Sequence, residues 1–311
     1  MSVRAVFDGP GAIRLAESDL AGPAAGELVI EVGDGVDNLS AGDRVCVDPN
    51  ITCGSCAYCR RGLTHLCSGL RPLGISRDGG FARFSHLPAR YAYRLPDHVP
   101  FEEGALVEPV ACCLRGIQQA ELSVGDSAVV LGAGPIGSIL LLLAQAAGAT
   151  RLAVIEPDPG RRARAANLGA DIVCDPADAV EAILDWSGGL GADVAIEASG
   201  RTVGAELALQ LVRRGGRVVW FGVYPERERL EISPYLVNEN ELSVRGSFNN
   251  PFTHQAALAV VGAGKLKLRE LISDRIPLHH LAHALSPESR PRGKVIVDPS
   301  LPDTPGTSLS L

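Results

Sequence analysis

A glycine-rich hexapeptide at residues 132–137 (GAGPIG) constrains the fold of this chain more than any other feature. It follows the apolar segment Ala128–Leu131, which reads as a strand, and it opens an apolar stretch that reads as a helix. In such a unit Gly132 permits the tight turn, Gly134 lets a pyrophosphate approach the backbone, and Gly137 lets helix and strand pack closely. A purely structural glycine turn is the alternative. The context favours a dinucleotide site at the helix N-terminus, and its predicted cofactor-binding residues are Gly132, Gly134, Pro135, Ile136 and Gly137.

Glu156 ends the next predicted strand, 19 positions after Gly137. An acidic side chain at that place accepts hydrogen bonds from ribose hydroxyls and repels a 2′-phosphate. We therefore predict that NAD is bound in preference to NADP. Arg161 and Arg162 follow closely and weaken this preference, because a guanidinium attracts a phosphate. Arg161 is included with Glu156 among the predicted cofactor-binding residues.

Strand-like and helical segments alternate from about residue 124, and Arg161–Leu168 and Val203–Val212 are two of the helical ones. This alternation predicts an α/β fold with a parallel, doubly wound sheet of the Rossmann type. A length of 311 residues suggests roughly two domains. The predicted strands of the sheet are Ala128–Leu131, Leu152–Ile155, Ile172–Cys174, Val194–Glu197, Val218–Phe221 and Leu242–Arg245.

The remaining segments read as short strands and turns. Residues 1–123 include strand-like Arg44–Val47 and Phe81–Leu87, each preceded by a glycine-containing turn. Short elements return from about residue 272 and end in strand-like Lys294–Val297. The tail at residues 300–311 is rich in Pro, Ser and Thr, and we expect it to be disordered.

Four cysteines fall within residues 53–67, at Cys53, Cys56, Cys59 and Cys67. Four thiolates close a tetrahedral shell around Zn²⁺ and leave no open position, so the spacing predicts one structural zinc ion. An iron–sulfur cluster is an alternative, because ferredoxins also use two-residue gaps between cysteines. Two disulfides are a further alternative, which a cytoplasmic location disfavours. With four cysteines available, we interpret His65 as a surface residue.

Charge and hydropathy exclude other classes of function. The net charge is −7 and no basic stripe is present, which argues against nucleic-acid binding. The longest apolar run, residues 136–147, is too short to span a bilayer, and no secretory signal is evident. We therefore predict a cytoplasmic protein without membrane or nucleic-acid partners.

The other cysteines and histidines show no metal-ligand spacing: Cys46, Cys112, Cys113, Cys174, His86, His98, His254, His279, His280 and His283.

Together these motifs resemble the zinc-type medium-chain dehydrogenase/reductase family, and the polyol and sorbitol dehydrogenase branch in particular. Besides the glycine motif and the four cysteines, the resemblance rests on residues 32–36 (VGDGV), 42–45 (GDRV), 78–82 (DGGFA), 108–109 (EP) and 246–252 (GSFNNPF). It implies a GroES-like β-barrel domain at 1–123 with the zinc lobe at 53–67, a Rossmann NAD-binding domain at 124–271, and a return to the first domain at 272–299. It also implies an alcohol or polyol substrate and a homo-oligomer, either a dimer or a tetramer.

One departure from the family pattern concerns the catalytic zinc. In the family, a long segment before the VGxGV turn carries a CGTD or CGSD motif and a GHE motif, which supply the Cys and His ligands. Here Glu27-Leu28-Val29 runs directly into Ile30-Glu31-Val32, and neither motif occurs elsewhere, so the barrel is predicted to be truncated. Only Glu108 has a counterpart among the family's ligands, and it is the one catalytic candidate. A replacement metal site built from Glu108 with Cys112 or Cys113 is a further possibility.

Three hypotheses follow. The chain is an NAD-dependent alcohol or polyol dehydrogenase with reduced, altered or absent activity; or it is a non-catalytic NAD-binding partner or sensor protein derived from one. The third is that an internal deletion or a faulty gene model removed the segment. Zinc content separates the first two, because a dehydrogenase of this type needs two ions per chain and this sequence supports one.

Overall fold

The computed structural model describes residues 2–7, 13–18, 33, 36–82, 85–286, 288–289 and 291–301, with only the backbone described at 2–7 and 13–18. The chain divides into two compact units. Unit 1 consists of Met1–Ala111 and Pro251–Leu311, and unit 2 consists of Cys112–Asn250. The second unit is thus inserted into the sequence of the first.

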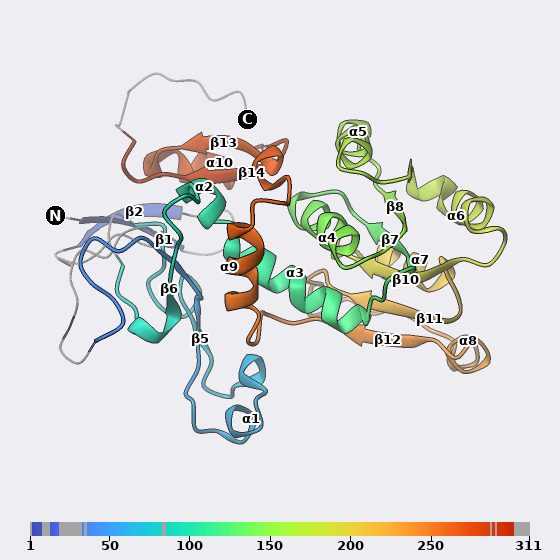
Figure 1. The fold of residues 1–311 in the computed structure, drawn as a ribbon, viewed down its shortest axis with the longest axis horizontal. Helices are drawn as coiled ribbons and strands as arrows, with labels where there is room; N and C mark the ends of the chain where they lie inside the picture. The colour runs from blue at the N-terminus through green and yellow to red at the C-terminus, as the bar shows by residue number, and fades with distance from the viewer. Residues whose placement is uncertain are drawn as a thin grey trace. The chain divides into compact units, whose positions relative to one another are not determined.

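Unit 2 is built on a six-stranded parallel sheet (Figure 1). Counted from its first strand, the spatial order is the 3-2-1-4-5-6 arrangement of doubly wound sheets. The predicted Rossmann sheet is confirmed, and each of the predicted strands overlaps an observed one. In spatial order the strands are β12 (Ser243–Gly246), β11 (Val212–Trp220), β10 (Ala192–Glu197), β7 (Ser127–Leu131), β8 (Arg151–Ile155) and β9 (Ile172–Cys174).

Helices cover both faces of this sheet. Val129 and Leu131 of β7 share one apolar cluster with Ile183 and Leu209, whereas Val130 lies against Gly137. Successive side chains of a strand point to opposite faces. The helix that contains Gly137 therefore packs on one face of the sheet, and the helices that contain Ile183 and Leu209 pack on the opposite face. The helices of unit 2 are α4 (Pro135–Ala146), α5 (Pro159–Asn167), α6 (Ala179–Ser187), α7 (Thr202–Gln210) and α8 (Pro234–Glu239), with 3₁₀ turn η3 (Pro176–Asp178).

β11 begins earlier than the sequence pattern predicts. Val212 pairs with Ala192 and Arg217 pairs with Val194, so residues 213–216 bulge out of the ladder. Gly215 takes a φ of +69° there, a conformation that favours glycine. Because the bulge interrupts the run of apolar residues, the sequence pattern did not predict the first part of the strand.

In unit 1 the described strands form four two-stranded pairs. β1 (Ser2–Phe7) pairs with β2 (Ile13–Ser18), and β13 (Ile272–Ile276) pairs with β14 (Lys294–Val297). The other pairs are β3 (Val45–Val47) with β6 (Ala92–Arg94), and β4 (Asn50–Ile51) with β5 (Arg71–Pro72). The helices are α1 (Ala57–Arg60), α2 (Phe101–Gly104), α9 (His254–Gly262) and α10 (Leu281–Ala284), with 3₁₀ turns η1 (Thr64–Leu66), η2 (Ala89–Tyr91), η4 (Leu268–Leu271) and η5 (Leu278–His280).

Arg44 connects β3 to the segment that leads into α2. Its guanidinium donates hydrogen bonds to the carbonyl oxygens of Pro96, Asp97 and Val99, at 3.0, 2.9 and 2.6 Å. The same group lies 4.2 Å from the centre of the Phe101 ring. One planar cation thus satisfies three carbonyls and stacks on an aromatic face, which a lysine could not do.

The two units divide at places other than 123 and 271. Helix α3 (Val107–Ala120) crosses the division, and from Cys112 onward it belongs to unit 2, where the thiol of Cys113 donates to the carbonyl oxygen of Ile136. Helix α9 belongs to unit 1, where His98 hydrogen-bonds the carbonyl oxygen of Gly262 at 2.8 Å. The apolar side chains of α3 and α9 could pack against either unit. The sequence pattern therefore does not show to which unit each helix belongs.

Some other expectations differ from the structure or fall outside it. The strand predicted at Phe81–Leu87 does not form in the described part of that segment, where Ala82 makes only an isolated bridge. The junction at Glu27–Val32 and residues 302–311 of the tail lie outside the described residues. No helix within the described ranges is both long and apolar enough to cross a membrane.

His254 is a buried polar residue at the start of α9, and its side chain is 1% exposed. Its ring lies 4.5 Å from that of Tyr93, and neither ring nitrogen has a hydrogen-bond partner within the described ranges. Burial lowers the pKa of His254, against an opposing contribution from the nearby Asp48. The neutral ring is therefore the form that the folded protein favours.

This burial predicts acid sensitivity. Between the lowered pKa and about 6.5, the pKa of an unfolded histidine, the unfolded chain binds more protons, so the free energy of unfolding falls as the pH falls. Burial raises the pKa of the neighbouring Tyr93, so its phenol stays neutral throughout this window. In melts at pH 7.5 and 5.5, His254→Phe should lose less stability on acidification than the unmodified chain. His86→Phe, at an exposed histidine, serves as the control; equal acid sensitivity of His254→Phe and the unmodified chain would contradict this account.

Candidate cofactor, metal and substrate sites

The predicted glycine loop lies between β7 and α4. Gly132 has a φ of +99°, and a Cβ at Gly137 would lie 1.8 Å from the carbonyl oxygen of Gly132, closer than atoms can approach. Gly134 is the N-cap of α4, and apart from its own chain neighbours no atom of the described residues lies within 4 Å of the place where its Cβ would be. Gly132 and Gly137 are thus required by the turn itself, whereas Gly134 leaves open space at the helix N-terminus, where an anion is favoured.

A cavity of about 930 Å³ opens beside this loop, within unit 2. Of the predicted residues, Gly132, Gly134, Glu156 and Arg161 line it, while Pro135, Ile136 and Gly137 form the first turn of α4 behind it. The wall also includes residues that the sequence pattern missed, Ala198, Ser199, Arg201, Val203, Gly204, Glu206, Leu207 and Gln210. They follow β10, which lies next to β7 where the strand order reverses, and ligands of doubly wound sheets bind at that place.

Glu156 joins the end of β8 to the glycine loop. It is 4% exposed, and its Oε2 accepts a hydrogen bond from the N–H of Ala133 at 2.7 Å. Its Oε1 accepts one from the N–H of Asp158 at 3.0 Å. Each carboxylate oxygen has a second lone pair. Glu156 can therefore accept further hydrogen bonds from a ligand in the cavity that it lines.

The arginines of α5 differ in what they contact. Arg162 donates to the carbonyl oxygen of Glu156 at 2.6 Å and pairs with Asp175 at 3.1 Å. Arg164 donates to the carbonyl oxygen of Ala133 at 3.2 Å. The guanidinium groups of Arg161 and Arg201 line the cavity and, within the part of the chain that the structure describes, make no hydrogen bond or ion pair. Arg161 and Arg201, and not Arg162, are therefore the cations available to a bound nucleotide.

Glu197 organises the turn after β10. It is completely buried; its Oε1 accepts hydrogen bonds from the N–H of Ser199 at 2.7 Å and from the Ser199 hydroxyl. Its other oxygen accepts the phenol proton of Tyr224, and burial together with this carboxylate raises the pKa of Tyr224. A buried carboxylate needs such partners, because an unpaired one is costly. Glu197 thus holds in place the turn after β10, which forms part of the cavity wall.

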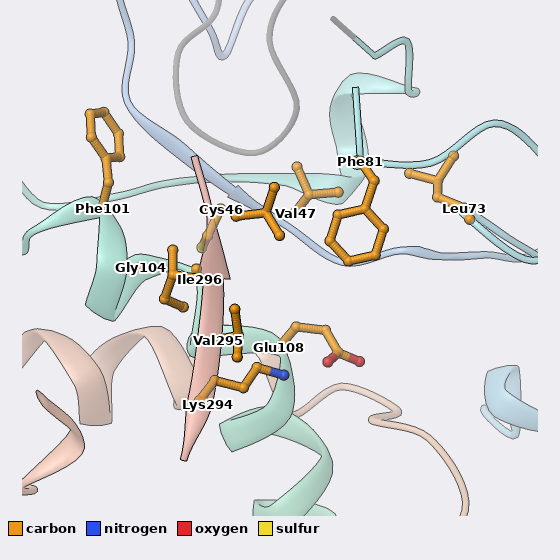
Figure 2. A pocket seen from close by; sticks show the side chains of 14 residues that line it. Cys46, Val47, Leu73, Phe81, Phe101, Gly104, Glu108, Lys294, Val295 and Ile296 are labelled. Carbon is orange, nitrogen blue, oxygen red and sulfur yellow. The ribbon is translucent and has the colours of Figure 1, made fainter. Parts of the chain in front are cut away.

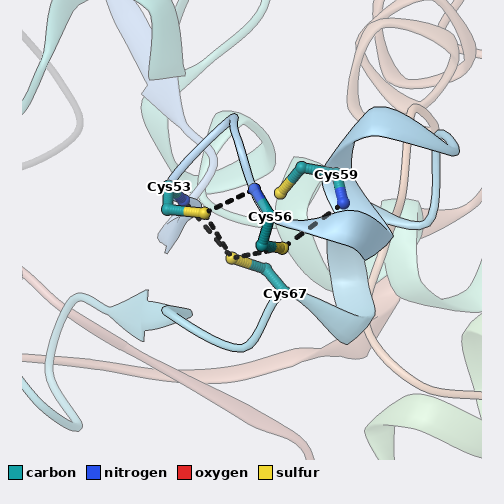
Figure 3. A group of neighbouring side chains, drawn as sticks. All are labelled: Cys53, Cys56, Cys59 and Cys67. Atoms are coloured by element: carbon teal, nitrogen blue, oxygen red, sulfur yellow. Dashed lines mark hydrogen bonds between the residues drawn. The ribbon is translucent and has the colours of Figure 1, made fainter.

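The four predicted metal ligands converge at the lobe around α1 (Figure 3). All four sulfur atoms lie within 4.8 Å of one another. The Sγ atoms of Cys53 and Cys67 are 3.5 Å apart, and those of Cys56 and Cys67 are 3.9 Å apart. A tetrahedron with zinc–sulfur bonds of ~2.3 Å has edges of ~3.8 Å. The four thiols therefore fit a zinc ion.

The same geometry decides among the alternatives. A disulfide needs sulfur atoms ~2.05 Å apart, and all four cysteines are free thiols. An iron–sulfur cluster is several ångströms across and would hold the sulfur atoms farther apart than a single ion does. Backbone N–H groups point at three of the sulfur atoms, for example from Cys56 to Cys53 at 3.3 Å, as is favourable for thiolate ligands.

Glu108 lies in a second cavity, of about 470 Å³, inside unit 1 (Figure 2). It sits in the first turn of α3, where the helix dipole favours a carboxylate. The remaining wall is mostly apolar: Val47, Leu73, Phe81, Phe101, Ala105, Val295, Ile296 and Val297, with Cys46 and Lys294. Burial raises the pKa of the Cys46 thiol to about 12, so that it is protonated at neutral pH.

A catalytic zinc ion does not fit the described residues. All seven histidines and all eight cysteines of the chain lie in the described part. In that part, the four-cysteine lobe is the only group of three or more His, Cys, Asp or Glu side chains that could hold a metal. Cys112 and Cys113 do not line the cavity that contains Glu108. The replacement site considered from the sequence stays a prediction.

Comparison with other proteins agrees with these sites. A family model described as zinc-binding dehydrogenase matches residues 135–261, and one described as alcohol dehydrogenase GroES-like domain matches residues 19–97. D-altritol 5-dehydrogenase from Agrobacterium fabrum is 34% identical over 261 residues, covering 83% of this chain and 76% of that protein. This chain belongs to the zinc-binding alcohol dehydrogenase family. The family resemblance and fold class predicted from the sequence are confirmed.

Two further members extend the comparison. The 2-dehydro-3-deoxy-L-galactonate 5-dehydrogenase from Pseudoalteromonas atlantica is 32% identical over 275 residues, which cover 87% of this chain and 80% of the relative. A zinc-binding dehydrogenase from Sinorhizobium meliloti 1021 was solved with NADP bound. It matches at 32% identity with a TM-score of 0.90, over 96% of this chain and 99% of that one. The description of the family model and the NADP bound to this solved structure agree with the zinc and dinucleotide sites described above.

The thiol geometry predicts zinc stoichiometry. We expect one tightly bound Zn²⁺ per chain, and Cys53→Ser should release it because three thiolates no longer close the shell. Elemental analysis after dialysis measures this, with Cys174→Ser as the control outside the lobe. Two tightly bound zinc ions per chain would show that a catalytic site exists after all.

The environment of Glu156 predicts cofactor preference. The unmodified dehydrogenase should bind NAD more tightly than NADP in calorimetry. Glu156→Gln keeps the side-chain volume and one acceptor oxygen but removes the negative charge that repels the 2′-phosphate of NADP. If this repulsion is ~1 kcal/mol, the preference for NAD over NADP should narrow about fivefold. Glu181→Gln, at an exposed glutamate outside the cavity, should leave the ratio unchanged. Equal or tighter NADP binding by the unmodified chain would refute the assignment.

Proposed function

We propose that this protein transfers hydride slowly between a secondary alcohol or polyol and NAD, without a catalytic zinc ion. The observation that carries the proposal is Glu108, an acidic side chain in an otherwise largely apolar cavity. Among the described residues, it belongs to no group of three or more side chains that could hold a metal ion. The relatives support the substrate class, because their names describe dehydrogenases of altritol and of a deoxygalactonate.

In this proposal the residues of each unit have separate tasks. Bound NAD supplies the hydride acceptor; the C–H bond of the alcohol breaks and the hydroxyl proton leaves, giving a ketone, NADH and H⁺. The carboxylate of Glu108 takes the hydroxyl proton as general base. The apolar wall around it, from β3, α2 and β14, excludes water and holds the carbon chain.

The expected rate is low for a chemical reason. A zinc ion in the family's catalytic site lowers the pKa of the bound alcohol before hydride leaves. A carboxylate is a far weaker base than an alkoxide, so it takes the hydroxyl proton of an alcohol poorly. The helix dipole at the start of α3 stabilises the charged carboxylate and makes it weaker still. Proximity to NAD alone leaves most of the barrier in place.

The four-cysteine lobe has no part in this chemistry. Its four thiolates leave no coordination position for a substrate. The ion would connect α1 and η1, which together span only a few residues and contain no buried residue of their own. We therefore propose a structural role for the zinc ion.

The lack of catalytic ligands favours a second candidate, a protein that binds NAD without turning it over. The cavity of unit 2 has the glycine loop and the wall of a dinucleotide site whether or not unit 1 is catalytic. Such a protein would act as a partner subunit or as a sensor of NAD.

Turnover of NAD separates the two candidates. With sorbitol, xylitol, threitol and simple secondary alcohols, we expect zinc-dependent oxidation to be very weak or undetectable. Any remaining activity should survive a mild chelation that leaves the structural zinc in place, and Glu108→Gln should lower it about 10²-fold or more, as for loss of a general base. Glu103→Gln on α2, whose carboxylate lies outside the cavity and pairs with Arg269, is the matched control.

The outcomes are distinct. Robust turnover that disappears on chelation would refute the proposal, because a catalytic metal would then be bound by residues other than those assigned. NAD binding without turnover in any variant would support the non-catalytic candidate.

A further inference from the structure

The cavity of unit 1 holds a second charged group besides Glu108. Lys294 is the first residue of β14, and in Figure 2 it and Glu108 extend toward the same part of the cavity from different elements. These two are the only charged side chains among the described residues that line it. Their neighbours in the wall, such as Phe81, Leu73 and Val295, are apolar.

The ammonium group of Lys294 is available to a ligand. In the part of the chain that the structure describes, its side chain makes no hydrogen bond and no ion pair, with Glu108 or with any other residue. The residue is only partly exposed. A cation in partly apolar surroundings attracts an anion more strongly than one in open water, because the effective dielectric constant is lower.

A neutral polyol gains less from this charge than an anion does, because its hydroxyl oxygens accept hydrogen bonds from an ammonium group but carry no charge. Glu108 needs only a hydroxyl to accept from, and any alcohol supplies one. Lys294, by contrast, is a compact point charge that favours an anionic group. A dianionic phosphate would meet the negative charge of Glu108 in the same cavity, whereas a single carboxylate balances Lys294 alone.

We propose that the cavity binds a monoanionic hydroxy acid, with its carboxylate on the Nζ of Lys294 and a hydroxyl donating to Glu108. The inference rests on the proposed function for the role of Glu108, and it adds the substrate class. The apolar wall then covers the carbon chain between the two polar ends. Lys294 is thereby a specificity-determining residue that separates sugar acids from sugar alcohols.

Two six-carbon probes test the proposal, because D-gluconate and D-sorbitol differ only at C1. Binding of each to the full chain is measured by calorimetry in the absence of turnover. We expect gluconate to bind about tenfold more tightly than sorbitol, the size of a charge-assisted hydrogen bond. Lys294→Gln should reduce gluconate binding to the level of sorbitol and leave sorbitol unchanged, whereas Lys294→Arg should keep most of the preference.

Controls distinguish this idea from loss of fold and from the proposed function. Lys265→Gln, at an exposed lysine outside the cavity, should behave as the unmodified chain, and NAD binding should be unchanged in all variants. Sorbitol binding equal to gluconate binding, a preference that survives Lys294→Gln, or no binding of either probe by an NAD-binding chain would overturn the inference. Tighter binding of sorbitol 6-phosphate would assign the cavity to phosphates instead. Gluconate binding that depends on Lys294 but gives no NADH would refute the proposed catalysis and leave this inference intact.

Discussion

The close approach of α4 to the end of β7 is the constraint on which the cofactor site depends. A Cβ at Gly137 would lie 1.8 Å from the carbonyl oxygen of Gly132, so any other residue there would force the helix away from the strand. Because the helix stays close, its N-terminus faces the cavity with open space at Gly134. Glu156 then accepts the N–H of Ala133 and ties the loop to β8. The cavity wall is thus determined by backbone geometry before any ligand binds.

The two units carry separate parts of a dehydrogenase. Unit 2 has the complete doubly wound sheet, with the cavity where the strand order reverses. Unit 1 has the zinc lobe, the contacts of Arg44 and a second cavity with Glu108 and Lys294. The zinc ligands come from one short stretch, so a metal ion can hold that lobe together where little apolar surface is available to bury. The catalytic zinc of the family would need ligands that neither unit supplies among the described residues.

This combination separates binding from chemistry. The candidate dinucleotide cavity is lined by the glycine loop and by the turns after β8 and β10. Alcohol activation depends on removing the proton of a hydroxyl, which a carboxylate does poorly without a metal ion that lowers the pKa of that hydroxyl. In the inference drawn above, the charge of Lys294 selects which molecules bind in the cavity. Under the proposed function, affinity and rate therefore depend on different residues.

Local patterns in the sequence determined the metal ligands, the glycine loop and the order of strands and helices. Each of these depends on residues a few positions apart, where spacing alone dictates geometry: four thiols within one loop, or glycines within one turn. The tertiary structure alone decided that Arg161 is available to a ligand while Arg162 is engaged, and that Ser199 and Arg201 complete the cofactor cavity. It also decided that Lys294 lines the same cavity as Glu108, and that α9 packs in unit 1. These contacts join residues that lie far apart in the chain. Such residues meet only when whole helices and strands pack together, and the local spacing of residues does not determine that packing.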